Sequence, residues 1–323
     1  KVLFSGIYLR ILITGANGYI GSRLCQYLKN QGHQIIAVCR STVPYTIGWS
    51  DKIEDNIVGD LILDETLNKV SKTNPDIIIH LVSLNQEDSE KNIEKALDVN
   101  VKLTWKLLER CSSLKIKKFI NFSSIHARDD ENRHKEIIYP KTHYGLTHLL
   151  SEKICNYYNQ KLNTECINVR LVNSYGEPLF KNSKGWGLVI NDLTKMSYLK
   201  NKIVLKSDGF SKLNFIHYND ICFILDKFIK NKINKSDQVV YFESDQIFSL
   251  LQVALIIQNV FYNRYKKSIT IYINDNQLFK KEESELSILN NFISQKKQSK
   301  GIKDFISMEK SINNLFKFLE DNF

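Results

Sequence analysis

Short apolar runs and one amphipathic stretch set the pattern of the first forty residues. Residues 11–13 and 35–38 are apolar runs of the kind that a buried parallel strand needs. Between them, three apolar residues recur on one face of a predicted helix, namely Ile20, Leu24 and Leu28. Gly32 follows, where that helix is expected to end. The pattern therefore predicts a strand, a turn, a helix and a second strand.

The turn between the first strand and the helix contains Gly15, Gly18 and Gly21 in the spacing G-x-x-G-x-x-G. Glycine lets such a turn close and lets a pyrophosphate approach the backbone, while the start of a helix offers N–H groups and a positive dipole end. Because a strand and a helix flank the triplet as required, we predict dinucleotide binding. The alternative is a tight strand-to-helix turn without a ligand.

The end of the second predicted strand bears on the choice of dinucleotide. A free ribose 2′-hydroxyl prefers a carboxylate at this position, whereas the chain has Cys39-Arg40-Ser41. Arg40 could pair with a 2′-phosphate, which favours NADP(H) over NAD(H). The alternative for Arg40 is an ordinary surface arginine.

Composition narrows the class of protein. The 323 residues are 43% hydrophobic and 25% charged, which is typical of a soluble globular protein. No apolar run predicts a membrane span, and the start, KVLFSGIYLR, is too short for a secretory signal and is expected to be irregular. The six cysteines form no C-x-x-C pair, so we expect reduced thiols in the cytoplasm and no metal site.

The net charge of +10 comes from lysines that are spread along the chain. This spread favours a solvated basic surface, or a general attraction for anionic substrates, over a nucleic-acid-binding stripe. The lysine-rich segment SQKKQSKG (294–301) is expected to be a surface loop.

Further segments carry a specific resemblance. In order they are TGANGYIG (14–21), GDL (59–61), DIIIHLVS (76–83), VNVKLTWKLLERC (99–111), KKFINFSS (117–124), YPKTHYGLTHLLSEK (139–153), VRLVNSYG (169–176), VLKSDGFSKLNFIHYNDIC (204–222) and YFESDQIFSLLQVALII (241–257). This ordered series resembles the extended short-chain dehydrogenase/reductases of the NAD-dependent epimerase/dehydratase family, which act on nucleotide sugars. One such segment alone would be weak evidence for the resemblance, but nine segments in the family's order are specific evidence.

The resemblance implies a set of cofactor-binding residues. They are Gly15, Asn17, Gly18, Tyr19, Ile20 and Gly21 in the glycine turn, Asp60 and Leu61 at the adenine, Leu81, Val82 and Ser83 after the fourth strand, and Asn100, Tyr144 and His148, to which Arg40 is added. The expected cofactor is NADP, with NAD as the other possibility.

The resemblance also implies the chemistry. In this family a tyrosine exchanges a proton with a sugar hydroxyl, usually at C4, while hydride passes between that carbon and nicotinamide. A lysine one helical turn after the tyrosine lowers its pKa and holds the nicotinamide ribose. Here the tyrosine is Tyr144, but its partner is His148, which is mostly neutral at cellular pH and reaches less far. Either His148 still orients the ribose, or acid–base catalysis is impaired; we favour retained activity because the cofactor motifs are intact.

Ser124 matches the family's second catalytic hydroxyl, which bonds the reacting oxygen; its alternative role is to cap the following loop. On the substrate side the resemblance implies contacts from Ser83, Ser124, His126, Asn173 and Lys212. Leu213 stands where the family commonly has an arginine for the substrate pyrophosphate, and Lys212 cannot form the same bidentate contact. No acid pair follows Ser124, so we predict epimerisation or carbonyl reduction rather than 4,6-dehydration.

These observations predict an α/β fold, a doubly wound parallel sheet with a smaller C-terminal lobe. Residues 1–173 would form the dinucleotide-binding domain and residues 174–323 mainly the substrate lobe, with segments returning to the first sheet. Helices at 92–111 and 143–161 correspond to the family's dimer interface, so a homodimer is expected. Two alternatives to a nucleotide-sugar enzyme are a cofactor-binding sensor or scaffold without turnover, and an RNA-binding relative.

Overall fold

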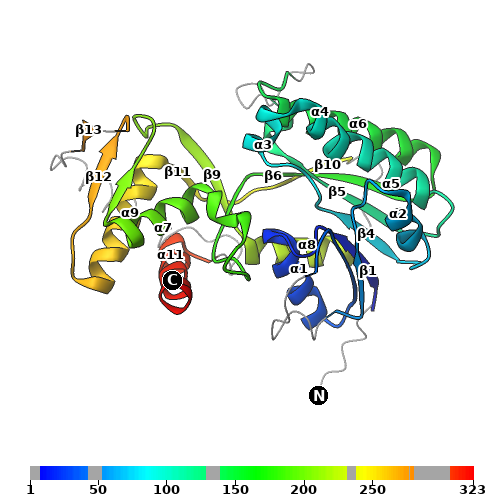
Figure 1. Ribbon diagram of the computed structural model, residues 1–323, viewed down its shortest axis with the longest axis horizontal. Helices are drawn as coiled ribbons and strands as arrows, with labels where there is room; N and C mark the ends of the chain where they lie inside the picture. The colour runs from blue at the N-terminus through cyan, green and yellow to red at the C-terminus, as the bar shows by residue number, and fades with distance from the viewer. Residues whose placement is uncertain (1–7, 43–52, 129–138, 231–237, 276, 280–305) are drawn as a thin grey trace. The chain divides into compact units, whose positions relative to one another are not determined.

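The structure is a computed structural model that describes residues 8–42, 53–128, 139–230, 238–275, 277–279 and 306–323 (Figure 1). The expectations for residues 294–301 and for the first seven residues lie outside these ranges. Within them, no helix combines the length and the apolar character that crossing a bilayer requires.

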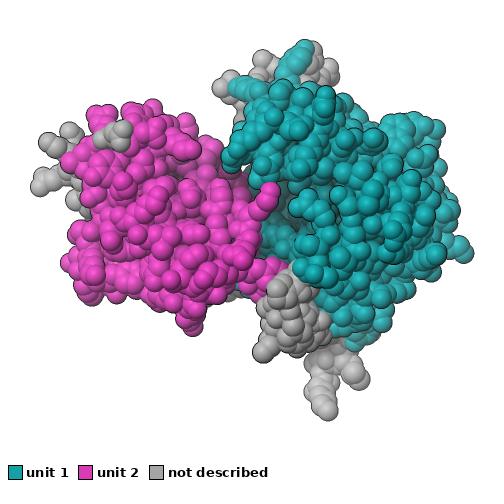
Figure 2. Space-filling model, in the orientation of Figure 1, with its two compact units in different colours: residues 1–172, 222–242 teal, residues 173–221, 243–323 magenta. Residues whose placement is uncertain are grey.

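The chain divides into two compact units (Figure 2). Unit 1 comprises residues 1–172 and 222–242, and unit 2 comprises residues 173–221 and 243–323. The chain therefore passes from one unit to the other three times, at 172/173, 221/222 and 242/243. The substrate-binding role of the C-terminal lobe stays a prediction.

Unit 1 is built on a parallel sheet of seven strands in the order β10-β6-β5-β4-β1-β2-β3. The strands are β1 (Arg10–Thr14), β2 (Gln34–Cys39), β3 (Asp55–Val58), β4 (Ile77–His80), β5 (Lys118–Ser124), β6 (Glu165–Leu171) and β10 (Val239–Phe242). The strand order reverses between β1 and β4, which is where doubly wound sheets bind ligands beyond the carboxyl ends of the strands. The predicted fold class is confirmed.

Helices cover both faces of this sheet (Figure 1). They are α1 (Tyr19–Asn30), α2 (Asp64–Ser71), α3 (Gln86–Lys91), α4 (Ile93–Ala96), α5 (Leu103–Cys111), α6 (His143–Lys161) and α8 (Tyr218–Lys230), with a short 3-10 helix η3 (Ile125–Ala127). Apolar residues of α2, α5 and α6 form one core cluster with β1, β2, β4 and β5, while α1 and α8 lie on the opposite face.

The helix predicted at about 92–111 is present, but it is not α-helical throughout. The segment consists of α4, then a π-helix η2 (Leu97–Lys102), then α5. The π turn adds a residue to the helical repeat and brings Asn100 inward, where it is 3% exposed. The predicted helix at 143–161, in contrast, coincides with α6.

Unit 2 contains two small sheets, ordered β11-β9-β7 and β13-β12-β8. Their strands are β7 (Asn173–Tyr175), β8 (Lys202–Val204), β9 (Lys212–His217), β11 (Ile247–Ser249), β12 (Thr270–Ile273) and β13 (Gln277–Leu278). A 3-10 turn η5 (Lys184–Gly187) leads into α7 (Val189–Lys200), and α9 (Leu250–Tyr265) and α11 (Met308–Asn322) follow.

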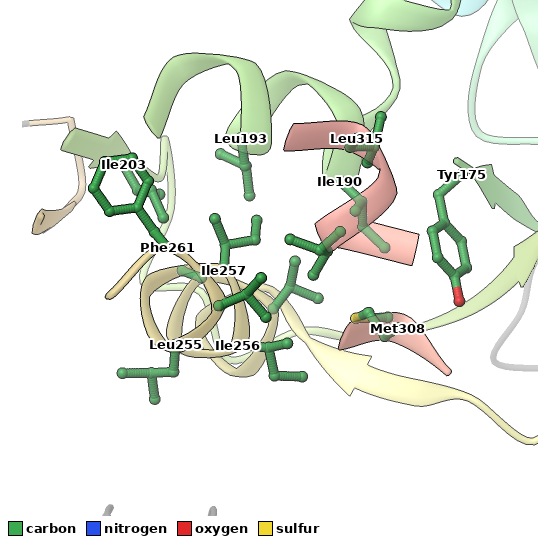
Figure 3. Packing of buried hydrophobic residues seen from close by; sticks show 14 of the residues in the cluster. Tyr175, Ile190, Leu193, Ile203, Leu255, Ile256, Ile257, Phe261, Met308 and Leu315 are labelled. Carbon is green, nitrogen blue, oxygen red and sulfur yellow. The ribbon is translucent and has the colours of Figure 1, made fainter. Parts of the chain in front are cut away.

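The core of unit 2 lies between these three helices. Figure 3 shows the apolar side chains that fill it, including Ile190 and Leu193 from α7, Ile257 and Phe261 from α9, and Leu315 from α11. Helix α9 begins with a capping box in which Ser249 and Gln252 each bond the other's backbone amide.

Candidate active site

The glycine turn leads from β1 into α1, and its three glycines are needed for different reasons. Gly15 adopts a left-handed conformation with φ of 69°. A Cβ on Gly21 would lie 2.2 Å from the Gly15 carbonyl oxygen, and one on Gly18 would lie 3.0 Å from the same atom. No side chain caps the start of α1. The turn therefore offers backbone rather than side chains to a ligand, as pyrophosphate binding requires.

The segment after β4 packs directly on this turn. A Cβ on Gly15 would lie 3.3 Å from a Val82 methyl carbon and 3.5 Å from the Leu81 carbonyl carbon. The Leu81 amide donates to Thr14 Oγ1 at 3.1 Å, which fixes the carboxyl ends of β1 and β4 to each other. Ser83 is exposed just beyond. These predicted cofactor residues therefore lie together at the point where the strand order reverses.

Arg40 and Asp60 follow the carboxyl ends of β2 and β3. Arg40 is exposed, one residue after β2, and Asn17 Nδ2 of the glycine turn donates to the neighbouring Ser41 carbonyl at 3.4 Å. Asp60 Oδ1 accepts from the Ile62 amide at 3.1 Å and so shapes the turn, while Leu61 is 5% exposed beneath it. Both positions border the same edge of the sheet as the glycine turn.

The start of α6 is held by two acceptors. Thr142 is the N-cap and its Oγ1 accepts from the Gly145 amide at 3.0 Å. Glu90 of α3 accepts from the Tyr144 amide at 3.2 Å and pairs with His143 at 3.3 Å. A Cβ on Gly145 would lie 2.0 Å from the His126 carbonyl oxygen, so only glycine permits α6 to approach η3 this closely.

Tyr144 faces the loop that follows β5. Its phenol lies close enough to the Ser124 hydroxyl to interact with it, and the centroid of its ring lies 6.1 Å from that of the exposed His126. Burial raises the pKa of Tyr144, and the Ser124 hydroxyl partly offsets that rise. Ser124 Oγ also accepts from the His126 amide at 3.2 Å. Ser124 therefore does both things that the sequence left open: it caps the loop after β5, and it contacts Tyr144.

His148 follows one turn later on α6. Its ring is edge-on to Tyr144 with 4.5 Å between centroids, and the residue is 3% exposed. Nε2 of His148 is buried without a hydrogen-bond partner among the described residues. Burial first, and then the neighbouring His126 and His80, lower the pKa of His148 to about 3. The imidazole is therefore neutral near pH 7.

Asn100 connects the cofactor side of the site to α6. Its Oδ1 accepts from the Leu84 amide at 2.7 Å, and its Nδ2 donates to Thr147 Oγ1 at 2.9 Å. Thr147 is the residue just before His148, and its hydroxyl donates to the Tyr144 carbonyl. The π turn of η2 thus places the Asn100 side-chain amide between the segment after β4 and the turn of α6 that carries Tyr144 and His148.

A model of the NAD dependent epimerase/dehydratase family matches residues 11–241. The chain belongs to this family. Its curated relatives include CDP-abequose synthase of Yersinia pseudotuberculosis, 25% identical over 66% of this chain and 70% of the relative, and UDP-glucose 4-epimerase of Mycoplasma genitalium, 27% identical over 80% of this chain and 83% of the relative. The resemblance predicted from sequence is confirmed.

Solved structures give the same fold. UDP-glucuronic acid 4-epimerase from Bacillus cereus, in complex with UDP-glucuronic acid and NAD, matches with a TM-score of 0.74 at 20% identity, over 97% of this chain and 99% of the other. UDP-glucose 4-epimerase from Thermotoga maritima, with UDP-glucose, matches with a TM-score of 0.76 at 17% identity, over 96% of this chain and 98% of the other.

For a member of this family, the residues present fit a nicotinamide dinucleotide. The glycine turn is a backbone cradle that a Cβ would fill, and the switch point of the sheet lies beside it. Unit 1 brings together the predicted residues from Gly15 to His148. Asn173 and Lys212 belong to unit 2, where Asn173 Nδ2 donates to the Asn214 carbonyl and Lys212 is exposed at the start of β9. Leu213 packs against the unit 2 core.

Sequence reasoning missed three residues that shape this family site. Gly145 fixes the approach of α6, and a small residue directly after the tyrosine was its sequence signal. Thr14 and His80 end neighbouring strands, and Thr14 Oγ1 lies 2.8 Å from His80 Nδ1. Burial lowers the pKa of His80 to about 4. His80 is therefore neutral near pH 7, and it lies close enough to His148 to contribute to the lowering of that residue's pKa.

Proposed function

We propose that the chain is an NAD(P)-dependent enzyme that modifies a nucleotide-linked sugar by hydride transfer at a ring carbon, C4 by family resemblance. The observation that carries this proposal is the placement of the Tyr144 phenol beside the Ser124 hydroxyl, in the unit that also holds the glycine turn. A phenol paired with a serine hydroxyl is suited to moving a proton to or from a sugar oxygen.

Each residue then has a distinct role. Tyr144 exchanges the proton, and Ser124 hydrogen-bonds the reacting oxygen and the phenol. His148 offers its buried Nε2 to the nicotinamide ribose, in place of the family's lysine. When bound, the nicotinamide supplies or accepts the hydride.

The test uses the full chain. Thermal shift with NADH, NADPH and a panel of nucleotide sugars is expected to show stabilisation by a cofactor and by at least one sugar nucleotide. Turnover of that sugar should fall at least about 100-fold in Tyr144→Phe, because general acid–base catalysis contributes that much. Cofactor stabilisation without any sugar binding or turnover would instead support a cofactor-binding protein without catalysis.

Arg40 underlies a proposed preference for NADP(H), although the family description and the neighbouring structures name NAD. Replacing Arg40 by Asp should weaken NADPH binding about 10-fold or more and spare NADH, since a charge-assisted bond contributes about 1.5–3 kcal/mol. Fluorescence titration of each cofactor measures the ratio. Lys200→Asp, on α7 of unit 2, changes the net charge equally and should leave the ratio unaltered. An unchanged ratio in Arg40→Asp would refute the preference.

A homodimer is also proposed. The outer face of α5 and α6 exposes large apolar side chains, including Trp105 at 46% and Tyr157 at 44%, whose rings stack at 6.2 Å. Leu146 and Leu150 extend the same apolar surface along α6 at 41% and 37% exposure. Such a contiguous patch is typical of a protein interface.

A further inference from the structure

We propose that this site keeps Tyr144 in its proton-donating form, so that the enzyme reduces a keto group on a nucleotide-linked sugar rather than interconverting two hydroxy sugars. The inference rests on the proposed function and narrows its substrate class to keto sugars. It follows from what surrounds the phenol.

A neutral group, His148, occupies the position whose positive charge would allow the tyrosine to act as a base. In the family a lysine one turn after the tyrosine places a positive charge beside the phenol. Here His148 is 3% exposed, its Nε2 has no partner among the described residues, and no carboxylate pairs with it there. Charging an imidazole in such a place is costly, and its pKa of about 3 agrees.

Among the residues that the structure describes, groups on the other packed elements do not replace that charge. On η3, His126 lies 6.1 Å from the Tyr144 ring, and on β4, His80 is buried with a pKa lowered by burial to about 4. On α3, Glu90 bonds the Tyr144 amide and pairs with His143, so it adds a negative charge near the helix start. Lys153, further along α6, is exposed. Burial therefore prevails and the pKa of Tyr144 rises above its ordinary value.

A protonated phenol suits one direction of the reaction. In reduction, the carbonyl carbon gains a hydride from the reduced nicotinamide as the C=O π bond breaks, and the carbonyl oxygen takes the proton of Tyr144. The sugar is reduced, the nicotinamide is oxidised, and the tyrosinate regains a proton from solvent. Oxidation of a hydroxy sugar must start from tyrosinate, which is below about one part in a thousand at pH 7 when the tyrosine pKa exceeds about 10. An epimerase needs that oxidation in every turnover.

The first experiment titrates the tyrosine in the free protein. Tyrosinate absorbance of the full chain is recorded against pH, and the curve of Tyr144→Phe is subtracted. We expect no ionisation of Tyr144 below about pH 9. His148→Lys should move the midpoint to lower pH, whereas His148→Gln, which stays neutral, should leave it unchanged. A wild-type midpoint below about pH 8 would overturn the inference even if His148→Lys fails to fold.

The second experiment measures both directions with a nucleotide-linked keto sugar and its reduced product. The reduction kcat/KM is expected to be flat between about pH 6 and 9, and the oxidation kcat/KM to rise about 10-fold per pH unit. Rapid interconversion of two hydroxy sugars at neutral pH would overturn the inference and leave the proposed function standing. Cofactor binding without reaction of any sugar nucleotide would overturn both.

Discussion

Gly145 is the single residue on which the geometry of the tyrosine most depends. A methyl group here would meet the His126 carbonyl oxygen at 2.0 Å and its carbonyl carbon at 2.9 Å, and these backbone atoms have little room to yield. Gly145→Ala is expected to move α6 away from η3 and to separate Tyr144 from Ser124. A misplacement of about 1 Å costs about 100-fold in rate, so kcat should fall by that order.

The matched control for this substitution is Gly187→Ala in η5. A Cβ at Gly187 has nothing within 4 Å, so turnover and melting temperature should both stay near wild type. Steady-state kinetics measures the loss of active-site geometry, and circular dichroism shows whether the variant is still folded. Full activity in Gly145→Ala would show that the contact between α6 and η3 does not position the tyrosine.

His80 and His148 make stability depend on pH. Their pKa values in the folded protein are about 4 and about 3, while an unfolded histidine has a pKa of about 6.5. Below about pH 6.5 the unfolded chain therefore binds protons that the folded chain does not, and the free energy of unfolding falls. The loss is at most about 1.4 kcal/mol per pH unit for each histidine, and it levels off once the pH reaches the folded value.

Urea denaturation between pH 7.5 and 5 measures this slope. His148→Gln removes one of the two groups, so its free energy of unfolding should fall less steeply with acid than that of wild type. Equal slopes in the two proteins would mean that His148 is protonated in the folded state.

At the scale of elements, an ion pair buried in unit 1 ties α6 to the sheet. Arg170 of β6 donates to both carboxylate oxygens of Glu152, at 2.9 and 2.7 Å, and Ser123 of β5 donates to the same carboxylate at 2.5 Å. Both charged residues are about 3% exposed. Glu152→Ala would leave a buried guanidinium unpaired, and we expect a loss of about 3–5 kcal/mol in the free energy of unfolding.

Chemical denaturation measures this loss, and Glu65→Ala supplies the comparison. Glu65 pairs with Lys69 on the exposed face of α2, where solvent screens the charges, so its removal should change stability little. A similarly small effect in Glu152→Ala would mean that water reaches Arg170.

The sequence pattern predicted those helices, strands and turns that neighbouring residues determine. Apolar runs located β1 and β2, and the glycine spacing located the turn into α1, while the family resemblance located α6. The π turn at Leu97–Lys102 was missed because its cause is distant in sequence. Asn100 bonds the Leu84 amide and the Thr147 hydroxyl, and neither contact changes the helical spacing of apolar residues in the sequence. The sequence predicted a mostly neutral His148, but it did not show the burial that lowers the pKa of His148 further.

At the scale of the whole molecule, the apolar face of α5 and α6 predicts self-association. Trp105→Glu places a charge in the middle of this face and should convert a dimer to a monomer in analytical ultracentrifugation. Tyr262→Glu is the control, because Tyr262 is 50% exposed on α9 of unit 2 and is not part of α5 or α6. A wild-type chain that sediments as a monomer at micromolar concentration would contradict the proposed dimer.

The chain passes between its two units three times, and this limits where the chain can be truncated. A fragment that stops at residue 172 lacks β10, the neighbour of β6, and also the part of α8 that covers the sheet. The edge of β6 would then present unpaired amides and carbonyls, which invite pairing with other chains. Unit 1 is thus not separable by a simple truncation, since the strand that pairs with β6 is synthesised only after part of unit 2.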